Sequence, residues 1–223
     1  MQVSRIPTGA PHAALGQDRD LDDAGDRSGG DVRGAILTHV VCRAVNNSGV
    51  VIRGERVVLR PFRPEELDQW HSARMASADD RTQFPVGPPD PERLCERVER
   101  SGELRHGTLD LAVDVDGRLI GEIGTYAEPG REMRPGLFFL SIALFRPQDR
   151  GRGLGTDAVR VLCDWLFRSA GAERIESSTA ISNPAMRGVF EKLGFGFEGV
   201  KSRWDVDWAH YAVSREQWNV DPS

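Results

Sequence analysis

The chain has 223 residues, of which 29 are Lys or Arg and 34 are Asp or Glu, so its formal net charge is −5. This acidic balance disfavours a generally basic protein that binds nucleic acid directly. No apolar run approaches the roughly 18 residues that a membrane-spanning helix needs, and the first residues lack the pattern of a secretory signal. The three cysteines form no C-x-x-C pair, so no metal site is predicted. We therefore expect a cytoplasmic protein without a membrane partner.

The chain divides into two parts by composition. Residues 1–50 are rich in Asp, Gly, Arg and Ser, and they contain too few apolar residues to offset the entropy of ordering the chain. This segment is predicted to be a disordered N-terminal tail. Residues 51–220 have the size and composition of one globular domain.

The first half of this domain is predicted to contain three strands and two helices. A strand is predicted at 56–61, and helices begin at Pro64 and at Asp90–Pro91, where proline occupies the first helical position. The proline-rich segment 77–89 between them is predicted to be a loop. Alternating apolar residues on both sides of Asp116–Gly117 predict a hairpin with strands at 108–115 and 118–126.

The second half begins with an apolar run at 138–145, which predicts a strand buried on both faces. A helix follows and ends near Gly171, a strand is predicted at 174–180, and a short helix runs from Asn183 to Gly194. The last two strands are predicted at 197–204 and 208–214. The resulting order, βααβββαβαββ, predicts an α/β protein with a mixed sheet and helices on both sides.

A glycine-rich segment, R-G-R-G-L-G-T at 150–156, lies between the predicted buried strand and the following helix. Three alternating glycines remove side chains that would keep an anion away from the backbone. The N–H groups of the loop and of the helix N-terminus can then bind phosphate oxygens. Arg146, Arg150 and Arg152 add positive charge, so the segment is predicted to bind a phosphate group.

Several interpretations of this segment compete. The first is a tight strand-to-helix connection without a ligand. The second is the dinucleotide fingerprint, which requires Gly or Ala where this chain has Thr156, although Glu176 lies about 20 residues further on, as that fingerprint expects. A Walker loop is excluded, because no Gly-Lys-Ser/Thr follows.

A third interpretation draws on a second segment, N-P-A-M-R-G-V-F-E-K-L-G-F at 183–195. The two segments together resemble the GNAT superfamily of acyl-CoA-dependent N-acyltransferases, whose R/Q-x-x-G-x-G/A signature matches at Arg150, Gly153 and Gly155. The sequences G-E-R-V-V-L-R-P at 54–61 and I-G-E-I-G at 120–124 resemble the RimJ/RimL-type branch. Members of that branch acetylate α-amino groups of ribosomal proteins or small amines such as antibiotics.

The resemblance covers residues 53–218 and implies a GNAT-type fold, with a mixed, mostly antiparallel central sheet of about seven strands flanked by helices on both faces. It also implies that acetyl-CoA is the co-substrate. The backbone of Leu144 and Phe145 would pair with the pantetheine arm, and Asn183 would lie near the pantetheine or a water at the thioester. The residues implied to contact acetyl-CoA are Leu144, Phe145, Arg150, Gly151, Arg152, Gly153, Leu154, Gly155, Thr156, Asn183 and Phe190.

The catalytic residues are less directly indicated. Many relatives carry Tyr near Phe190 or Ser near Met186 as the acid that protonates the leaving thiolate, and this chain has neither. Glu122 is the candidate base, because it lies on a central strand beside glycines that leave the backbone accessible; a solvated strand carboxylate is the alternative. Tyr126 and Tyr211 are the candidate acids.

These observations predict an N-acetyltransferase that acts by direct attack of a primary amine in a ternary complex. The acceptor is a protein α-amino terminus or a small-molecule amine, including an antibiotic. The alternatives are a non-catalytic acyl-CoA-binding module and an enzyme that binds NAD. A homodimer is a candidate assembly.

Overall fold

The computed structural model describes residues 49–76, 90–126, 134–203 and 205–218. All of these residues belong to the unit Gly34–Ser223. The predicted tail, except for its last two residues, and the predicted loop at 77–89, whose residues 84–89 are expected to line the acceptor entrance, lie outside the described residues. Among the helices described, none combines the length and the apolar character that crossing a membrane requires.

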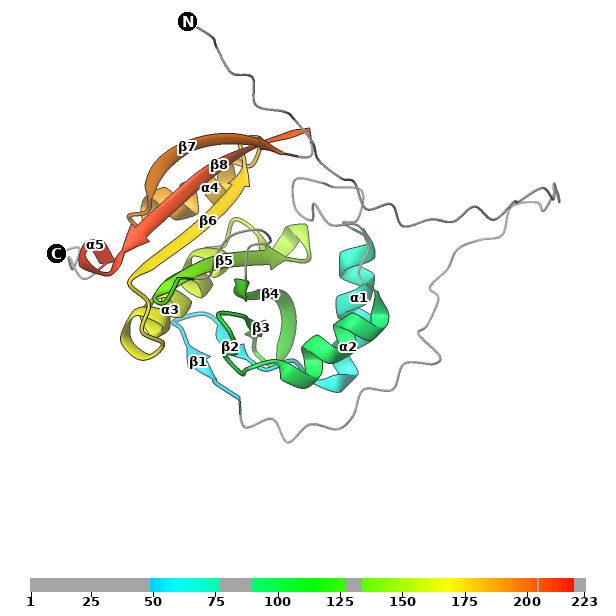
Figure 1. The fold of residues 1–223 in the computed structure, drawn as a ribbon. Helices are drawn as coiled ribbons and strands as arrows, with labels where there is room; N and C mark the ends of the chain where they lie inside the picture. Colours follow the sequence, from blue (N-terminus) through cyan, green and yellow to red (C-terminus); the bar gives the residue numbers. More distant parts are fainter. Residues whose placement is uncertain (1–48, 77–89, 127–133, 204, 219–223) are drawn as a thin grey trace, which may run out of the picture. The chain divides into compact units, whose positions relative to one another are not determined.

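The centre of the unit is one eight-stranded sheet with the strand order β1-β2-β3-β4-β5-β6-β8-β7 (Figure 1). Every neighbouring pair is antiparallel except β5 and β6, which run parallel. The strands are β1 (Ile52–Arg53), β2 (Val58–Arg60), β3 (Leu109–Val115), β4 (Arg118–Tyr126), β5 (Leu137–Leu144), β6 (Arg174–Ala180), β7 (Gly196–Arg203) and β8 (Val206–Ser214). The mixed, mostly antiparallel sheet is confirmed, and the two-residue β1 is an additional strand.

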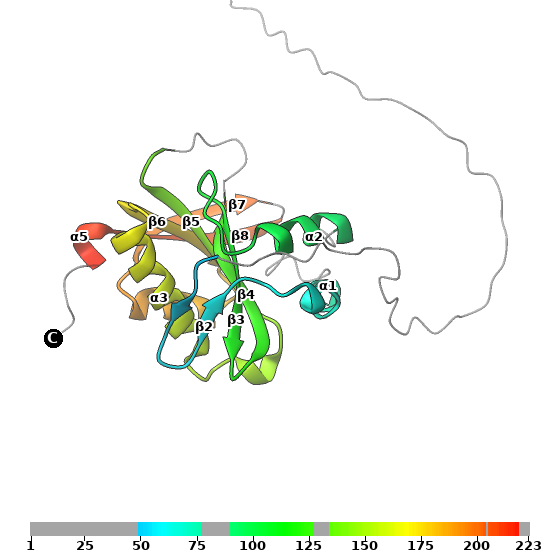
Figure 2. The same ribbon diagram turned by 90° about the horizontal axis from the view of Figure 1, so that it is seen from below.

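Helices cover both faces of this sheet, as predicted. Helices α1 (Leu67–Ala76) and α2 (Pro91–Arg100) lie on one side of β3 and β4, and α3 (Leu154–Ser169) lies on the other side (Figure 2). Helix α4 (Pro184–Lys192) packs through Phe190 against Tyr211 of β8, and α5 (Arg215–Trp218) ends the described chain. Short 3-10 turns at Pro64–Glu66 and Pro147–Asp149 precede α1 and α3.

Alternation of apolar residues along the strands divides the core into two clusters. Leu109, Leu111 and Val113 of β3 pack with α3 in the larger cluster. Ala112 faces the opposite side and packs with Trp70 and other residues of α1 and α2 in the smaller cluster. The period of two along a strand therefore supplies an apolar surface to the helices on each face.

The β3–β4 hairpin has the predicted turn. Asp116 and Gly117 have φ values of 53° and 81°, the left-handed conformations that a two-residue type I′ turn requires. The Gly117 N–H donates to the Asp114 carboxylate at 2.7 Å. The Asp-Gly pair was a reliable signal because the turn depends on adjacent residues alone.

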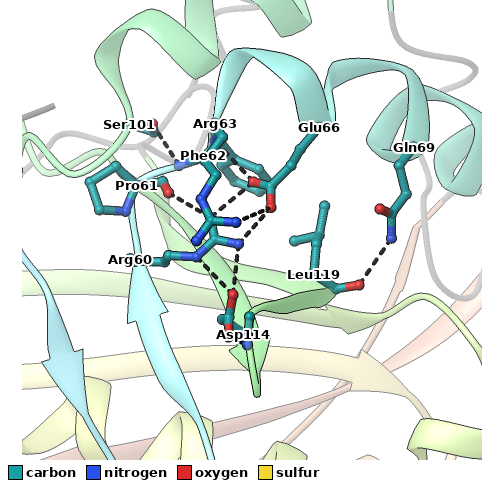
Figure 3. Close-up of polar contacts among 10 residues, drawn as sticks. Arg60, Pro61, Phe62, Arg63, Glu66, Gln69, Ser101, Asp114 and Leu119 are labelled. Carbon is teal, nitrogen blue, oxygen red and sulfur yellow. Dashed lines mark hydrogen bonds and ion pairs between the residues drawn. The ribbon is translucent and has the colours of Figure 1, made fainter. Parts of the chain in front are cut away.

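A buried arginine fixes the position of α1 against the sheet (Figure 3). The Arg60 Nη2 lies 2.5 Å from Glu66 Oε1 in the 3-10 turn before α1, and its Nε donates to Asp114 Oδ2 of β3 at 2.9 Å. Glu66 also accepts the Arg63 N–H at 2.9 Å. Because Arg60, Glu66 and Asp114 are all buried, one guanidinium is the shared cation of two carboxylates that water cannot solvate.

Candidate functional site

The site begins where β5 and β6 separate. The two strands pair only through Leu137–Phe139 and Arg174–Glu176, and Figure 1 shows them diverging beyond this point. The Ser177 hydroxyl donates to the Leu140 carbonyl at 2.8 Å, just beyond the last paired residues. The expected burial of this strand on both faces is therefore wrong for its second half: Leu137–Leu140 is buried, but Ser141 is exposed and the next three residues are half-buried.

Backbone geometry shows which groups of β5 face the gap in pairing. The Phe145 N–H donates to the Ile120 carbonyl of β4 at 2.9 Å, so the peptide groups of Leu144, Ile142 and Leu140 point the opposite way, because strand residues alternate. Two contacts agree with this assignment, since the Leu144 and Leu140 carbonyls accept hydrogen bonds from Arg150 and Ser177. The edge that faces β6 thus presents Ile142 and Leu144, whereas the Phe145 amide is engaged within the sheet, contrary to the expectation that it faces the pantetheine arm.

The glycine loop follows this strand and leads into α3. Gly151 and Gly153 have φ values of 70° and 78°, and Gly153 is the N-cap of α3. Among the described residues, no side chain caps this helix, and the first N–H groups of any helix lack an intrahelical acceptor. The amides of Leu154, Gly155 and Thr156 therefore remain available to an anion, and the helix dipole reinforces the attraction.

The loop and the strand edge form one continuous surface. A Cβ at Gly155 would lie 3.8 Å from Leu144 Cδ1 and 4.0 Å from Ile142 Cδ1, so the glycine stands directly beside the second half of β5. The exposed Arg150 extends across the same junction, donating from Nη2 to the Leu144 carbonyl at 3.0 Å. The amides of the α3 N-terminus and the edge of β5 that faces β6 are thus adjacent.

The groups in this arrangement match the chemistry of two parts of acetyl-CoA, the pyrophosphate and the pantetheine arm. The pyrophosphate requires N–H donors and positive charge, which the α3 N-terminus and the exposed arginines 146, 150 and 152 supply. The pantetheine arm contains amides that can pair with the strand edge of Ile142 and Leu144, where the Leu144 carbonyl also accepts from Arg150. Within the described ranges, no group of three His, Cys, Asp or Glu is arranged to hold a metal ion.

A buried carboxylate fixes the N-terminus of α3. Asp157 accepts the backbone N–H groups of Arg56 at 2.8 Å and Val57 at 3.2 Å, and the Arg160 guanidinium at 2.7 Å. Burial by itself raises the pKa of Asp157, but the hydrogen bonds from Arg56, Arg160 and Val57 outweigh it, so the pKa lies below its ordinary value. The negative charge in this first turn is therefore directed at the β1–β2 turn.

Replacing Asp157 by asparagine is expected to destabilise the fold by about 1–3 kcal/mol at pH 7, because buried N–H donors lose an anionic acceptor. A lowered folded-state pKa means that the stabilisation is present above the unfolded value of about 4 and is lost as pH falls through the folded value. Urea unfolding of both proteins at pH 7 and pH 3 measures this. An equal difference at the two pH values would contradict the assignment to the carboxylate.

The Glu122 carboxylate lies on the face of β4 that packs on α1 and α2. Its side chain accepts Trp70 Nε1 at 2.8 Å and Arg74 Nη1 at 2.8 Å, and Arg97 Nη2 lies 3.5 Å away. Glu122 is 8% exposed. Arg97 also pairs with Asp110 of β3, so two carboxylates and two guanidiniums balance their charges on this face.

The other residues predicted to be catalytic or to contact the cofactor are spread over different elements of the fold. Tyr126 and Glu122 point to the same face of β4, but four residues of strand separate them by about 13 Å. Asn183 caps α4 by accepting the Met186 N–H at 3.1 Å, which leaves its amide nitrogen as a donor. Phe190 is 1% exposed and packs between Phe195 and Tyr211. Its contact with acetyl-CoA stays a prediction, as do the catalytic roles of the other three.

Tyr211, the other candidate acid, is buried in β8. Its hydroxyl donates to Glu191 Oε1 at 3.1 Å and accepts from Arg187 Nε at 3.3 Å. Both partners belong to α4, so this hydroxyl links α4 to the sheet.

Two residues of this region were missed. Ile142 has the same orientation as Leu144 and follows from strand alternation once the direction of one amide is known. Arg56 reaches the glycine loop and donates to the Arg152 carbonyl at 2.8 Å. Arg56 and Arg152 are 96 positions apart, and no local pattern indicates their contact.

Comparisons with known proteins agree with this geometry. The family model described as "Acetyltransferase (GNAT) domain" matches residues 56–196. The SPbeta prophage-derived uncharacterized N-acetyltransferase YokL of Bacillus subtilis is 26% identical over 149 residues, which are 66% of this chain and 79% of that protein.

Solved structures extend the match to the fold. Mycobacterium smegmatis RimJ in complex with CoA-disulfide has a TM-score of 0.62 and 19% identity, covering 78% of this chain and 91% of RimJ. The aminoglycoside acetyltransferase AAC(6')-Ib in complex with ribostamycin and coenzyme A has a TM-score of 0.63 and 21% identity, covering 76% of this chain and 99% of that one. The predicted fold resemblance is confirmed.

Proposed function

The chain belongs to the GNAT acetyltransferase domain family and is an acyl-CoA-dependent N-acetyltransferase, and on this premise we propose that its acceptor is the α-amino terminus of a peptide or protein. Such an amine has a pKa near 7.8, so about a quarter of it is neutral at physiological pH. A lysine side chain with a pKa near 10.4 needs roughly 3.5 kcal/mol more to lose its proton.

The observation that carries this proposal is that the Glu122 carboxylate is already engaged by neighbouring side chains. Three side chains already contact it, so it is poorly placed to take a proton from a strongly basic amine. An amine that is already partly neutral depends less on a base to remove its proton. Holding that amine beside the thioester then provides much of the rate enhancement.

The charge balance on the same face favours a peptide over a polycation. Asp110 and Glu122 are both paired with arginines, and they therefore offer little net attraction for an aminoglycoside. A small-molecule amine, including an antibiotic, is the alternative that the test below includes.

In the proposed reaction, the neutral amine nitrogen would attack the thioester carbonyl carbon of bound acetyl-CoA, the carbon–sulfur bond would break, and the CoA thiolate would leave with a proton that balances the one lost by the nitrogen. The loop amides at 151–156 hold the pyrophosphate, and Ile142 and Leu144 pair with the pantetheine arm. A backbone N–H on that edge of β5 also stabilises negative charge that develops on the thioester oxygen. Asn183 donates from its amide nitrogen, and Tyr126 is the candidate donor to the departing thiolate.

Thiol release from acetyl-CoA tests the acceptor. The protein is offered peptides with a free α-amine, the same peptides blocked at the α-amine but carrying lysine, and aminoglycosides. We expect release with the free α-amine at least ten times faster than with the blocked peptides. Faster release with aminoglycosides would replace the proposed acceptor, and binding of acetyl-CoA without release for any amine would favour a non-catalytic module. The cytoplasmic location and the homodimer stay predictions.

The base role of Glu122 is tested by its pH profile. If Glu122 takes the proton, Glu122→Gln removes the acidic limb of the profile of kcat/KM against pH. Because the carboxylate is held by Trp70, Arg74 and Arg97, we expect instead that the limb keeps its position and that stability falls by about 1–3 kcal/mol. Arg74→Gln is the control, because it removes one partner and leaves the carboxylate in place.

A further inference from the structure

Arg56 lies in the turn between β1 and β2, far in sequence from the glycine loop that it contacts. Its Nη1 donates to the Arg152 carbonyl at 2.8 Å. A Cβ built on Gly153 would lie 3.3 Å from the same nitrogen. The guanidinium therefore rests against the N-cap residue of α3.

The backbone of this turn is held where it is by α3 itself. The Arg56 N–H donates to Asp157 Oδ2 at 2.8 Å, and Asp157 belongs to the first turn of that helix. A Cβ at Gly54 would lie 2.4 Å from the same oxygen, so the glycine permits this close approach. The side chain of Arg56 thus starts from a fixed point beside the helix N-terminus.

The guanidinium has capacity for a second partner. Arg56 is exposed, and among the described residues its side chain hydrogen-bonds to the Arg152 carbonyl alone. An arginine carries five N–H donors in a planar fork that matches the oxygens of a phosphate group. The charge stands next to amides of Leu154, Gly155 and Thr156, which also favour an anion.

We propose that Arg56 is a further binding residue for acyl-CoA and contacts one of its phosphate groups. This inference rests on the proposed function, because it needs CoA to bind at the glycine loop. The pyrophosphate and the 3′-phosphate share the chemistry that a guanidinium recognises, and dephospho-CoA, which lacks the 3′-phosphate, separates them. The N-terminal turn is thereby part of the cofactor site.

Calorimetric binding of CoA and dephospho-CoA to the full chain tests the proposal at 50 and 500 mM NaCl. Arg56→Gln keeps a donor for the Arg152 carbonyl and removes the charge. Arg53→Gln is the matched control, because it removes an exposed charge from β1 of the same hairpin. At low salt we expect Kd for CoA to rise about tenfold in Arg56→Gln and less than about twofold in Arg53→Gln.

The dependence on salt separates binding from a structural role. Added salt screens an exposed contact between charges, so the difference between wild type and Arg56→Gln should narrow at 500 mM. Equal weakening at both salt concentrations, or an equal effect of Arg53→Gln, would overturn the proposal. A smaller effect on dephospho-CoA assigns the contact to the 3′-phosphate, and an equal effect assigns it to the pyrophosphate. If wild-type protein bound no CoA, the proposed function would fail instead.

Discussion

Replacing Gly153 by glutamate is expected to abolish the rise in melting temperature that acetyl-CoA produces in the wild-type protein. Gly153 caps α3 at a φ of 78°, and a carboxylate there would stand where the amides of the helix N-terminus attract phosphate. Opposed like charges cost several kcal/mol, so Kd should rise at least about a hundredfold. A wild-type protein at a hundred times Kd gains about 2.7 kcal/mol from the ligand, and the variant should gain almost none.

Gly171→Glu is the matched control for this result. Gly171 has a φ of 74° and nothing within 4 Å of a Cβ built on it, so the backbone strain is similar. It follows the C-terminal end of α3, about 24 Å of helix from Gly153. This variant should lose stability and keep its response to acetyl-CoA. If both variants lost the response, the effect would come from strain and the assignment of the phosphate loop would be wrong.

Replacing Arg60 by alanine is expected to have the largest effect on stability, a loss of about 3–5 kcal/mol. The change leaves the carboxylates of Glu66 and Asp114 buried without their shared cation. Urea unfolding at pH 7 measures the loss. The slope of the transition should stay near its wild-type value if the folded state remains intact.

Arg63→Ala provides the comparison for Arg60. Arg63 Nη1 lies 4.0 Å from Glu66 Oε1, and its side chain is 48% exposed, so its charge should contribute at most about 1 kcal/mol. Similar losses in the two variants would show that burial of the Arg60 network is not what stabilises α1 against the sheet.

Local signals predicted local structure well. The Asp116–Gly117 turn and the start of α2 at Asp90–Pro91 were predicted correctly. Asp90 caps α2 by accepting the Glu92 N–H at 2.9 Å. Each depends on residues close together in sequence. The two-residue β1 was missed because its only signal is pairing with β2, and α5 was missed because four residues are too few for a helical pattern.

The site was predictable in part for the same reason. The glycines at 151, 153 and 155 alternate within one short segment, so the sequence shows them together. The structure places this segment at the N-terminus of α3, as expected. The exposure of Ser141 was not predictable from the apolar sequence of β5. It arises because β6 diverges from β5 beyond Phe139, and this divergence depends on tertiary structure. The partners of Glu122 come from α1 and α2, 25 or more residues away, and no pattern around Glu122 indicates them.

The short pairing of β5 with β6 also has a consequence for protein turnover. The ladder that joins β1–β5 to β6–β8 spans three residues on each strand, whereas the neighbouring β4–β5 and β6–β8 ladders span six and seven, so few hydrogen bonds hold this seam of the sheet together. Transient opening of a seam admits proteases and exchanges amide protons with solvent. A ligand lying along this seam would suppress opening in proportion to its saturation. We therefore expect the amides of Ile142 and Leu144 to exchange more slowly with CoA present, and the enzyme's lifetime in a cell to follow the supply of its acyl donor.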